Sequence, residues 1–301
     1  KRGIWGTLNR LKQVVEQRKP LAVIAYLRGS SFMAPIACQL ARADTSVITS
    51  ERSSFTNGRP MIRDYASRAS LLLADHIVCN SREQCGSISR YMPWLKKKVK
   101  YIPNGISSGW FAGTGHPSTR GQNIIGVGRV HPSKDLSYFI SAIASISEEL
   151  RRRQVKVKWT GRIENKLYFD QIETEINQNS LHDIWVWNGE QSNMLDVYYD
   201  ASLFVMTSNL EGMPNVLIEA MACGAQCLVR PVSDSIEILG GNSGSVCNGS
   251  PIEFGRRIVA ILESGSKSSG ITSDELRTLA RRYSIEETAK KHLLLLADQS
   301  P

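Results

Sequence analysis

The 301-residue sequence lacks several patterns that mark common kinds of reaction chemistry. It contains no Asp-x-Asp pair, no zinc-ligand cysteine spacing, no Gly-x4-Gly-Lys-Ser/Thr loop and no serine nucleophile elbow. It also has no apolar run long enough to cross a bilayer and no signal segment of charged and then apolar residues. These absences argue against a metal-held carboxylate pair, a zinc site, a phosphate-loop nucleotidase and a serine hydrolase.

Cysteine is scarce, and its spacing is irregular. The six cysteines include no pair separated by two residues, and Cys38 and Cys79 directly follow apolar neighbours. We therefore interpret the cysteines as buried thiols of a cytosolic protein and not as a disulfide framework.

Acidic residues are sparse in the first third of the chain. Residues 1–105 hold 18 Lys and Arg against 6 Asp and Glu, and the whole chain has a formal net charge of +9. A basic region of this kind fits an anionic partner, either a membrane surface or a nucleic acid, although it can also be an ordinary solvated surface. No stacking-aromatic or helix-turn-helix signature accompanies the charge, so we expect no nucleic acid partner.

The composition, with 42% hydrophobic residues, is that of a globular protein, and the length predicts two domains. Short apolar runs, mostly rich in Val and Ile, alternate with amphipathic helical segments such as 136–149. The expected strands are Leu21–Tyr26, Ser46–Thr49, His76–Cys79, Val99–Ile102, Asn123–Val127, Val155–Thr160, Ile184–Trp187, Leu203–Met206 and Gln226–Val229. This alternation predicts an α/β fold with parallel sheets and helices on both faces.

A stretch rich in Gly, Pro and Ser at 106–122 lacks an apolar period and is expected to link the two domains. The first domain, 1–105, has only about four expected strands, so we expect it to lack an amino-terminal portion. The second domain spans 123–283. The last segment, 284–301, is expected to form a helix that crosses back to the first domain.

Residues 209–224, NLEGMPNVLIEAMACG, form the most informative segment. Pro214 is expected at the first position of a helix, and Gly224 just past its end. This arrangement puts Glu211 in a loop and Glu219 about one and a half turns into the helix. The first amides of such a helix face outward from the carboxyl end of a parallel strand, which is a natural diphosphate site.

Glu219 stands between apolar neighbours, Ile218 and Ala220. An inward carboxylate is costly unless it is paired or accepts hydrogen bonds. A vicinal diol such as a ribose would supply two donors. The sequence therefore indicates a nucleotide site at this helix.

A second segment, Ile124–Asp135, contains a glycine turn followed by Arg129 and Lys134, five positions apart. Two cations at this place can neutralise a diphosphate leaving group without a metal ion. The segment does not complete a dinucleotide fingerprint, because position 131 is His and not Gly. We interpret His131 as a loop residue.

Both segments resemble retaining glycosyltransferases of family four, which have the GT-B fold of two Rossmann-like doubly wound domains. Residues 209–224 resemble the family's Glu-x7-Glu motif, whose first Glu contacts the donor sugar and whose second Glu holds the ribose hydroxyls. By this resemblance, the two roles fall on Glu211 and Glu219. Arg129 and Lys134 resemble the family's Gly-Arg…Lys element, which grips the donor diphosphate.

The resemblance runs from Leu8 to Ala297 and implies further site residues. On the donor side these are Gly128, Gly161, Asn188, Gly212, Met213, Pro214, Asn215 and Val216. On the acceptor side, Glu51 and Arg52 belong to a Ser-Glu-Arg-Ser stretch that resembles enzymes of bacterial surface-polysaccharide assembly, and Asn104 belongs to an Ile-Pro-Asn-Gly turn. Many members carry a His in the first-domain strand where this chain has Tyr26 or its neighbours, so no His role is transferred.

The resemblance implies a metal-independent retaining glycosyltransferase without a cofactor. Its donor would be a nucleotide-sugar, with a UDP-sugar as the first choice, and its acceptor a saccharide or lipid-linked saccharide in polysaccharide biosynthesis. We expect a cytoplasmic protein whose basic first domain docks on the anionic inner face of the plasma membrane. The alternative is a non-catalytic nucleotide-sugar-binding or scaffold protein derived from the same fold.

Overall fold

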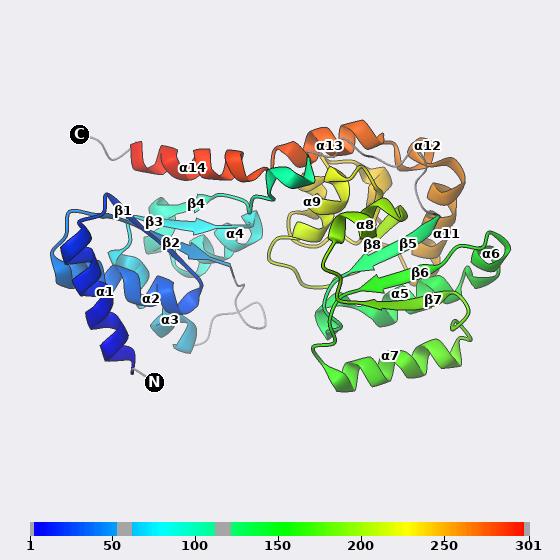
Figure 1. Cartoon of the computed structure of the whole chain (residues 1–301), viewed down its shortest axis with the longest axis horizontal. Helices are drawn as coiled ribbons and strands as arrows, with labels where there is room; N and C mark the ends of the chain where they lie inside the picture. Colours follow the sequence, from blue (N-terminus) through cyan, green and yellow to red (C-terminus); the bar gives the residue numbers. More distant parts are fainter. Residues whose placement is uncertain (1–2, 53–61, 112–121, 298–301) are drawn as a thin grey trace. The chain divides into compact units, whose positions relative to one another are not determined.

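The computed structural model describes residues 3–52, 62–111 and 122–297. The chain divides into two compact units, Lys1–Asn104 with Glu286–Pro301, and Gly105–Ile285 (Figure 1). Each unit contains a parallel sheet flanked by helices. The predicted α/β class is therefore confirmed. Within the predicted linker, residues 112–121 lie outside the described part of the chain.

The first unit, which we call unit 1, contains a sheet in the order β1-β2-β3-β4. Its strands are β1 (Ala22–Tyr26), β2 (Ser46–Glu51), β3 (His76–Cys79) and β4 (Val99–Tyr101). Its α-helices are α1 (Ile4–Arg18), α2 (Arg28–Ala41), α3 (Ile62–Arg68), α4 (Arg82–Tyr91) and α14 (Ile285–Ala297). Short 3₁₀ turns lie at Ala69–Leu73 and Pro93–Lys98.

Successive side chains of β3 point to opposite faces of the unit 1 sheet and so contribute to two different small hydrophobic cores, one on each face. Ile77 and Cys79 pack in one cluster with α4, whereas Val78 packs in another with Leu295 of α14. The Thr288 hydroxyl at the start of α14 also donates a hydrogen bond to the Pro103 carbonyl at 3.1 Å. The last helix thus packs on the sheet of unit 1.

The second unit, unit 2, contains a sheet in the order β7-β6-β5-β8-β9. Its strands are β5 (Asn123–Val127), β6 (Val157–Thr160), β7 (Trp185–Gly189), β8 (Ala201–Met206) and β9 (Gln226–Val229). Strands β6 and β7 lie on one side of β5, and strands β8 and β9 lie on the other. The order therefore reverses between β5 and β8, and ligands of doubly wound sheets bind outside the carboxyl ends at such a point.

Both faces of the unit 2 sheet are covered. Along β8, Phe204 and Met206 pack on one face, and Leu203 and Val205 pack on the other. One face is covered by α8 (Met194–Tyr199), α9 (Asn215–Ala222), α10 (Ser235–Ile238) and α13 (Ser273–Arg281). The opposite face is covered by α5 (Leu136–Ala144), α6 (Ser147–Arg152), α7 (Lys166–Gln178) and α11 (Pro251–Ser264), as Figure 1 shows. A short helix, α12 (Ser266–Ser269), follows α11.

Each expected strand corresponds to a strand of the structure, with ends that shift by up to two residues. The expected helix 136–149 is wrong as a single element, because α5 ends at Ala144 and α6 begins at Ser147. The hydroxyl of Ser145 bonds back to the Ala142 carbonyl at 2.7 Å, which favours a turn over a continuing helix. Among the described residues, none of the helices combines the length and apolar character that a bilayer crossing requires.

Candidate functional site

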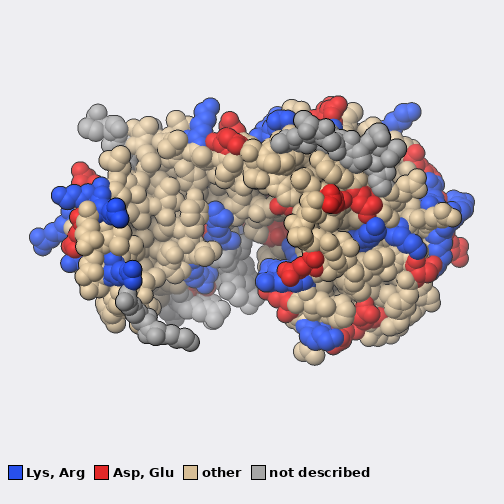
Figure 2. All heavy atoms as spheres, viewed as in Figure 1, with Lys and Arg blue, Asp and Glu red and all other residues tan. Residues whose placement is uncertain are grey.

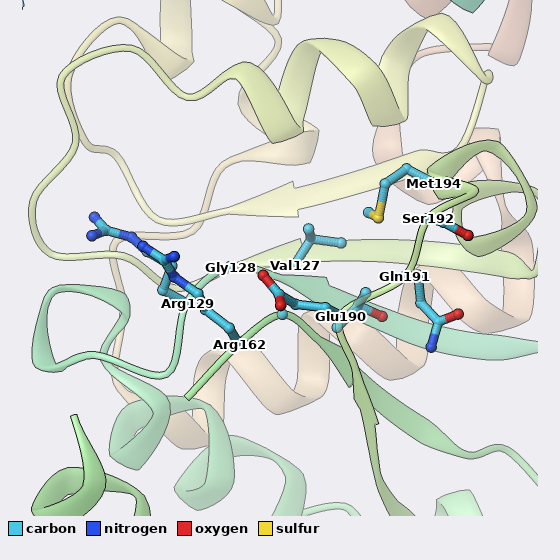
Figure 3. A pocket seen from close by; sticks show the side chains of 10 residues that line it. Val127, Gly128, Arg129, Arg162, Glu190, Gln191, Ser192 and Met194 are labelled. Carbon is cyan, nitrogen blue, oxygen red and sulfur yellow. The ribbon is translucent and has the colours of Figure 1, made fainter. Parts of the chain in front are cut away.

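A cavity of about 670 Å³ opens at the carboxyl ends of β5, β6 and β7 in unit 2. It is lined by Val127, Gly128, Arg129, Thr160, Gly161, Arg162, Glu190, Gln191, Ser192 and Met194. Figure 3 shows Arg129 and Arg162 on one side of this cavity and Gln191, Ser192 and Met194 on the other. The cavity therefore lies where three consecutive strands of the doubly wound sheet end.

Gly161 permits a close backbone approach in the cavity wall. A Cβ atom at this position would lie 2.2 Å from the Gly128 carbonyl oxygen, and its φ of +145° is one that other residues rarely adopt. The Gly161 amide donates to the Gly189 carbonyl at 2.8 Å. This glycine thus holds the loops after β5, β6 and β7 together.

Arg129 stands at the exposed rim of the cavity. Its Nη1 atom pairs with the carboxylate of Glu164 at 2.5 Å, and half of the Arg129 side chain is accessible to solvent. An exposed ion pair of this kind contributes little to stability. Its guanidinium can therefore exchange a carboxylate for an incoming phosphate at low cost.

Lys134 and Glu211 form a more enclosed pair. Lys134 Nζ lies 2.5 Å from Glu211 Oε1, and each side chain is only 12% exposed. The Ser208 hydroxyl donates to the same Glu211 oxygen at 2.7 Å. The stem of Lys134 passes over Gly128, since a Cβ there would lie 3.0 Å from Lys134 Cε. The pair is thereby adjacent to the wall of the cavity.

Hydrogen bonds between the loop after β5 and the loop after β8 bring Lys134 and Glu211 together. The Thr207 hydroxyl donates to the Lys134 carbonyl at 3.0 Å, and the Asn209 amide donates to the Ser133 carbonyl at 3.0 Å. Arg230 pairs with Asp135 at 2.5 Å on the same side. The first two contacts connect the loop after β5 with the loop after β8, which are 70 residues or more apart in the sequence but follow adjacent strands. The third connects the loop after β5 with the residue that follows β9.

Helix α9 begins one residue later than predicted. Pro214 is the N-cap, with ψ of 77°, because the Asn215 amide donates to the Met213 carbonyl and closes a turn before the helix. No side chain caps this N-terminus within the described residues. Gly224 follows the helix with φ of +70°, as predicted for the position after the last turn.

Glu219 projects from α9 into a largely buried environment. Its Oε2 atom accepts a hydrogen bond from the Tyr198 hydroxyl at 2.9 Å. Burial raises the pKa of the Glu219 carboxyl above its usual value, and the Tyr198 hydrogen bond acts in the opposite direction. Burial also raises the pKa of the Tyr198 hydroxyl well above its usual value, so this hydroxyl acts as a donor.

The predicted acceptor-side residues lie in unit 1. Glu51 is buried and pairs with Arg68 at 2.9 Å, so its carboxylate is already engaged inside the unit. Arg52 is exposed, and its guanidinium lies 4.8 Å from the ring centre of Tyr26. Asn104 ends the part of the chain that belongs to unit 1 before the crossing to unit 2. The Ser that follows Arg52 lies outside the described residues.

The predicted donor residues fall into two groups in unit 2. Gly128, Arg129 and Gly161 line the cavity, while Glu211 joins it through Lys134. Asn188 does not line it; its side chain donates to the Thr160 hydroxyl at 3.1 Å and so supports the wall from behind. The residues Gly212, Met213, Asn215 and Val216 lie at the turn and first positions of α9.

Sequence reasoning missed seven of the lining residues as site residues, namely Val127, Thr160, Arg162, Glu190, Gln191, Ser192 and Met194. Three of them lie in the loop between β7 and α8, which has no apolar period. The sequence did carry one signal there, the glycine turn at Asn188 and Gly189. The strand order β7-β6-β5 is needed to place that loop beside Gly128.

Comparison with known proteins locates a family domain in this unit. Residues 121–264 match the family described as "Glycosyl transferases group 1". The match includes the cavity, the Lys134–Glu211 pair and Glu219.

Two curated relatives and one solved structure are similar over between 45% and 98% of the chain. EpsF of Bacillus subtilis strain 168, a provisionally named glycosyltransferase, is 25% identical over 76% of this chain and 62% of its own length. The UDP-Gal:alpha-D-GlcNAc-diphosphoundecaprenol alpha-1,3-galactosyltransferase of Escherichia coli is 26% identical over 45% of this chain and 37% of its own. Alr3699/HepE of Anabaena, solved with UDP and glucose, has a TM-score of 0.79 at 16% identity and covers 98% of this chain and 84% of its own.

The matched region thus spans less than two thirds of the length of these two curated relatives. The likeness to solved glycosyltransferases extends over both units and identifies the fold as GT-B, with two Rossmann-like domains. The chain therefore has the GT-B fold, and the group 1 domain at residues 121–264 supports a glycosyltransferase.

Proposed function

We propose that the chain is a retaining, metal-independent glycosyltransferase that moves a sugar from a nucleotide-sugar, in the first place a UDP-sugar, to a saccharide or lipid-linked saccharide. The observation that carries this proposal is the enclosed Lys134–Glu211 pair beside Gly128, at the carboxyl edge of the unit 2 sheet. It places a cation and a carboxylate at the switch point between β5 and β8, next to the cavity at the ends of β5, β6 and β7. The resemblance implies donor binding for both residues, for Glu211 through the Glu-x7-Glu motif and for Lys134 through the Gly-Arg…Lys element.

The leaving group is a nucleoside diphosphate whose negative charge increases as the glycosidic bond breaks. Lys134 and Arg129 supply two cations for it, and the N-terminus of α9 supplies the positive end of the helix dipole. Arg129 would leave Glu164 for the phosphate, since their ion pair is solvent-exposed. These groups provide charge stabilisation from the protein alone, which is why we propose transfer without a metal ion.

Glu211 would orient the donor sugar through its hydroxyl groups. In the structure, Lys134 and Ser208 fix its carboxylate, so it needs little further ordering when a sugar binds. Glu219 would accept hydrogen bonds from the ribose hydroxyls, and the cavity would take the base. A cavity of about 670 Å³ is large enough for a nucleobase and part of a ribose.

On the acceptor side we propose an anionic membrane surface that presents a lipid-linked saccharide. Helix α1 carries exposed Arg10 and Arg18, and its Trp5 is 79% exposed. Figure 2 shows Lys and Arg side chains gathered over α1. Basic residues beside an exposed Trp are typical of peripheral binding to anionic lipid. The similar E. coli enzyme, by its name, acts on a diphosphoundecaprenol-linked sugar.

The competing proposal, a non-catalytic binding or scaffold protein, makes a different prediction. Calorimetry with UDP and GDP, followed by a panel of UDP- and GDP-sugars with saccharide acceptors, separates the two. We expect UDP binding, and release of UDP from one UDP-sugar with retained anomeric configuration in the product by NMR. UDP binding without turnover of any donor would favour the scaffold, and binding of neither nucleotide would refute both.

A further inference from the structure

Helix α8 connects the cavity with Glu219. Met194, its first residue, lines the cavity, and Tyr198, one turn later, donates its hydroxyl hydrogen bond to Glu219 Oε2 at 2.9 Å. Positions four apart lie on the same face of a helix. Asn193 caps this helix by accepting a hydrogen bond from the Leu195 amide at 3.2 Å. One face of a short, capped helix therefore reaches both parts of the proposed nucleotide site.

The ring of Tyr198 is held in one position. It is fully buried, and it makes edge contacts with Trp110 and Phe204 at centroid distances of 5.7 and 5.9 Å. Its hydroxyl therefore meets Glu219 in a fixed direction. Glu219 Oε1 accepts no hydrogen bond from any described residue, so this oxygen is left for a ligand.

We propose that Tyr198 is a positioning residue for ribose recognition. Its hydroxyl fixes the Glu219 carboxylate, and the fixed carboxylate distinguishes ribonucleotides from deoxyribonucleotides. This inference rests on the proposed function, because it needs a nucleotide in the unit 2 site. A carboxylate in an apolar environment must be both ionised and oriented to accept two hydroxyl donors. The Tyr198 hydroxyl stabilises the ionised form and takes up one acceptor site of Oε2, so Oε1 offers a diol both of its acceptor sites.

The groups that face this pair are few in the described structure. Glu219 interacts with Tyr198, and Tyr198 in turn lies near the thiols of Cys223 and Cys227. The causes of the raised pKa of Glu219 include no Lys or Arg of the described residues. The hydroxyl of Tyr198 is thus the main polar influence on the Glu219 carboxylate.

The test compares UDP with 2′,3′-dideoxy-UDP by calorimetry between pH 5.5 and 8.5, using the whole chain. We expect the wild type to prefer UDP by at least about tenfold, and Tyr198→Phe to reduce this preference by at least about threefold. Loss of the donor raises the pKa of Glu219 further, so UDP binding should begin to weaken at a higher pH than in the wild type as pH falls. Dideoxy-UDP binding should keep its affinity and pH profile.

Two further variants make the result unambiguous. Tyr138→Phe removes another hydroxyl, which donates to the Gly249 carbonyl at 2.9 Å, and should leave the UDP preference unchanged. Glu219→Gln keeps an oxygen acceptor for Tyr198 and should abolish the pH dependence, which tests the pair even if Tyr198→Phe fails to fold. The inference is wrong if Tyr198→Phe weakens both ligands equally without a pH shift. A wild type that binds neither UDP nor GDP instead refutes the nucleotide site itself.

Discussion

Gly161→Ala perturbs the point at which three loops of the cavity wall meet. The new Cβ would lie 2.2 Å from the Gly128 carbonyl oxygen, so this carbonyl must move by about 1 Å to reach an ordinary C···O contact. It accepts a hydrogen bond from Trp159 Nε1 at 2.9 Å, and losing that bond costs about 1–3 kcal/mol. The unfavourable φ adds about 1–3 kcal/mol, so we expect a total destabilisation of about 2–6 kcal/mol.

Gly189→Ala is the matched control for this variant. Gly189 also has a positive φ, +65°, and lies at the same sheet edge, but no heavy atom lies within 4 Å of its added Cβ. We therefore expect only the backbone cost of about 1–2 kcal/mol. Urea unfolding followed by tryptophan fluorescence gives the stabilities, and calorimetry with UDP gives the affinities. Equal destabilisation by the two variants, with wild-type UDP affinity in Gly161→Ala, would refute the close-approach reasoning.

Two further predictions concern charge. Lys134→Met should lower turnover of the donor by at least about 100-fold, since it removes a cation from the leaving group and leaves Glu211 with one partner. Lys158→Met, which breaks a more exposed pair with Asp200, should keep wild-type turnover; equal effects would contradict the role of Lys134. Trp5→Ala should weaken binding to vesicles that contain anionic phospholipid by several-fold. Salt at about 0.5 M should release the wild type from these vesicles, because exposed charges are strongly screened at that concentration. Equal binding to neutral vesicles would argue against an electrostatic contribution.

The sequence alone predicted much of the fold of unit 2, and physical reasons explain why. Its strands are short apolar runs whose type does not depend on distant partners, and the end of α9 is fixed locally by Gly224. The helix start was placed one residue too early, because the turn that closes before Asn215 depends on the Met213 carbonyl. Strand existence was therefore easier to predict than element ends.

The site was predicted only in part. Glu211 and Glu219 could be identified from one continuous segment. Glu190, in the loop after β7, and Met194, at the start of α8, could not, because their position at the cavity follows from the strand order β7-β6-β5 and not from any pattern in their local sequence. The Tyr198–Glu219 hydrogen bond joins positions 21 residues apart, and nothing in either local sequence indicates it.

The most direct measurement is a crystal structure of the whole chain with UDP bound. The account predicts that the base lies in the cavity between Arg162 and Met194, that the ribose hydroxyls donate to Glu219, and that the diphosphate contacts Arg129 and Lys134. UDP bound elsewhere in the molecule, or a diphosphate without contact to either cation, would contradict the central claim.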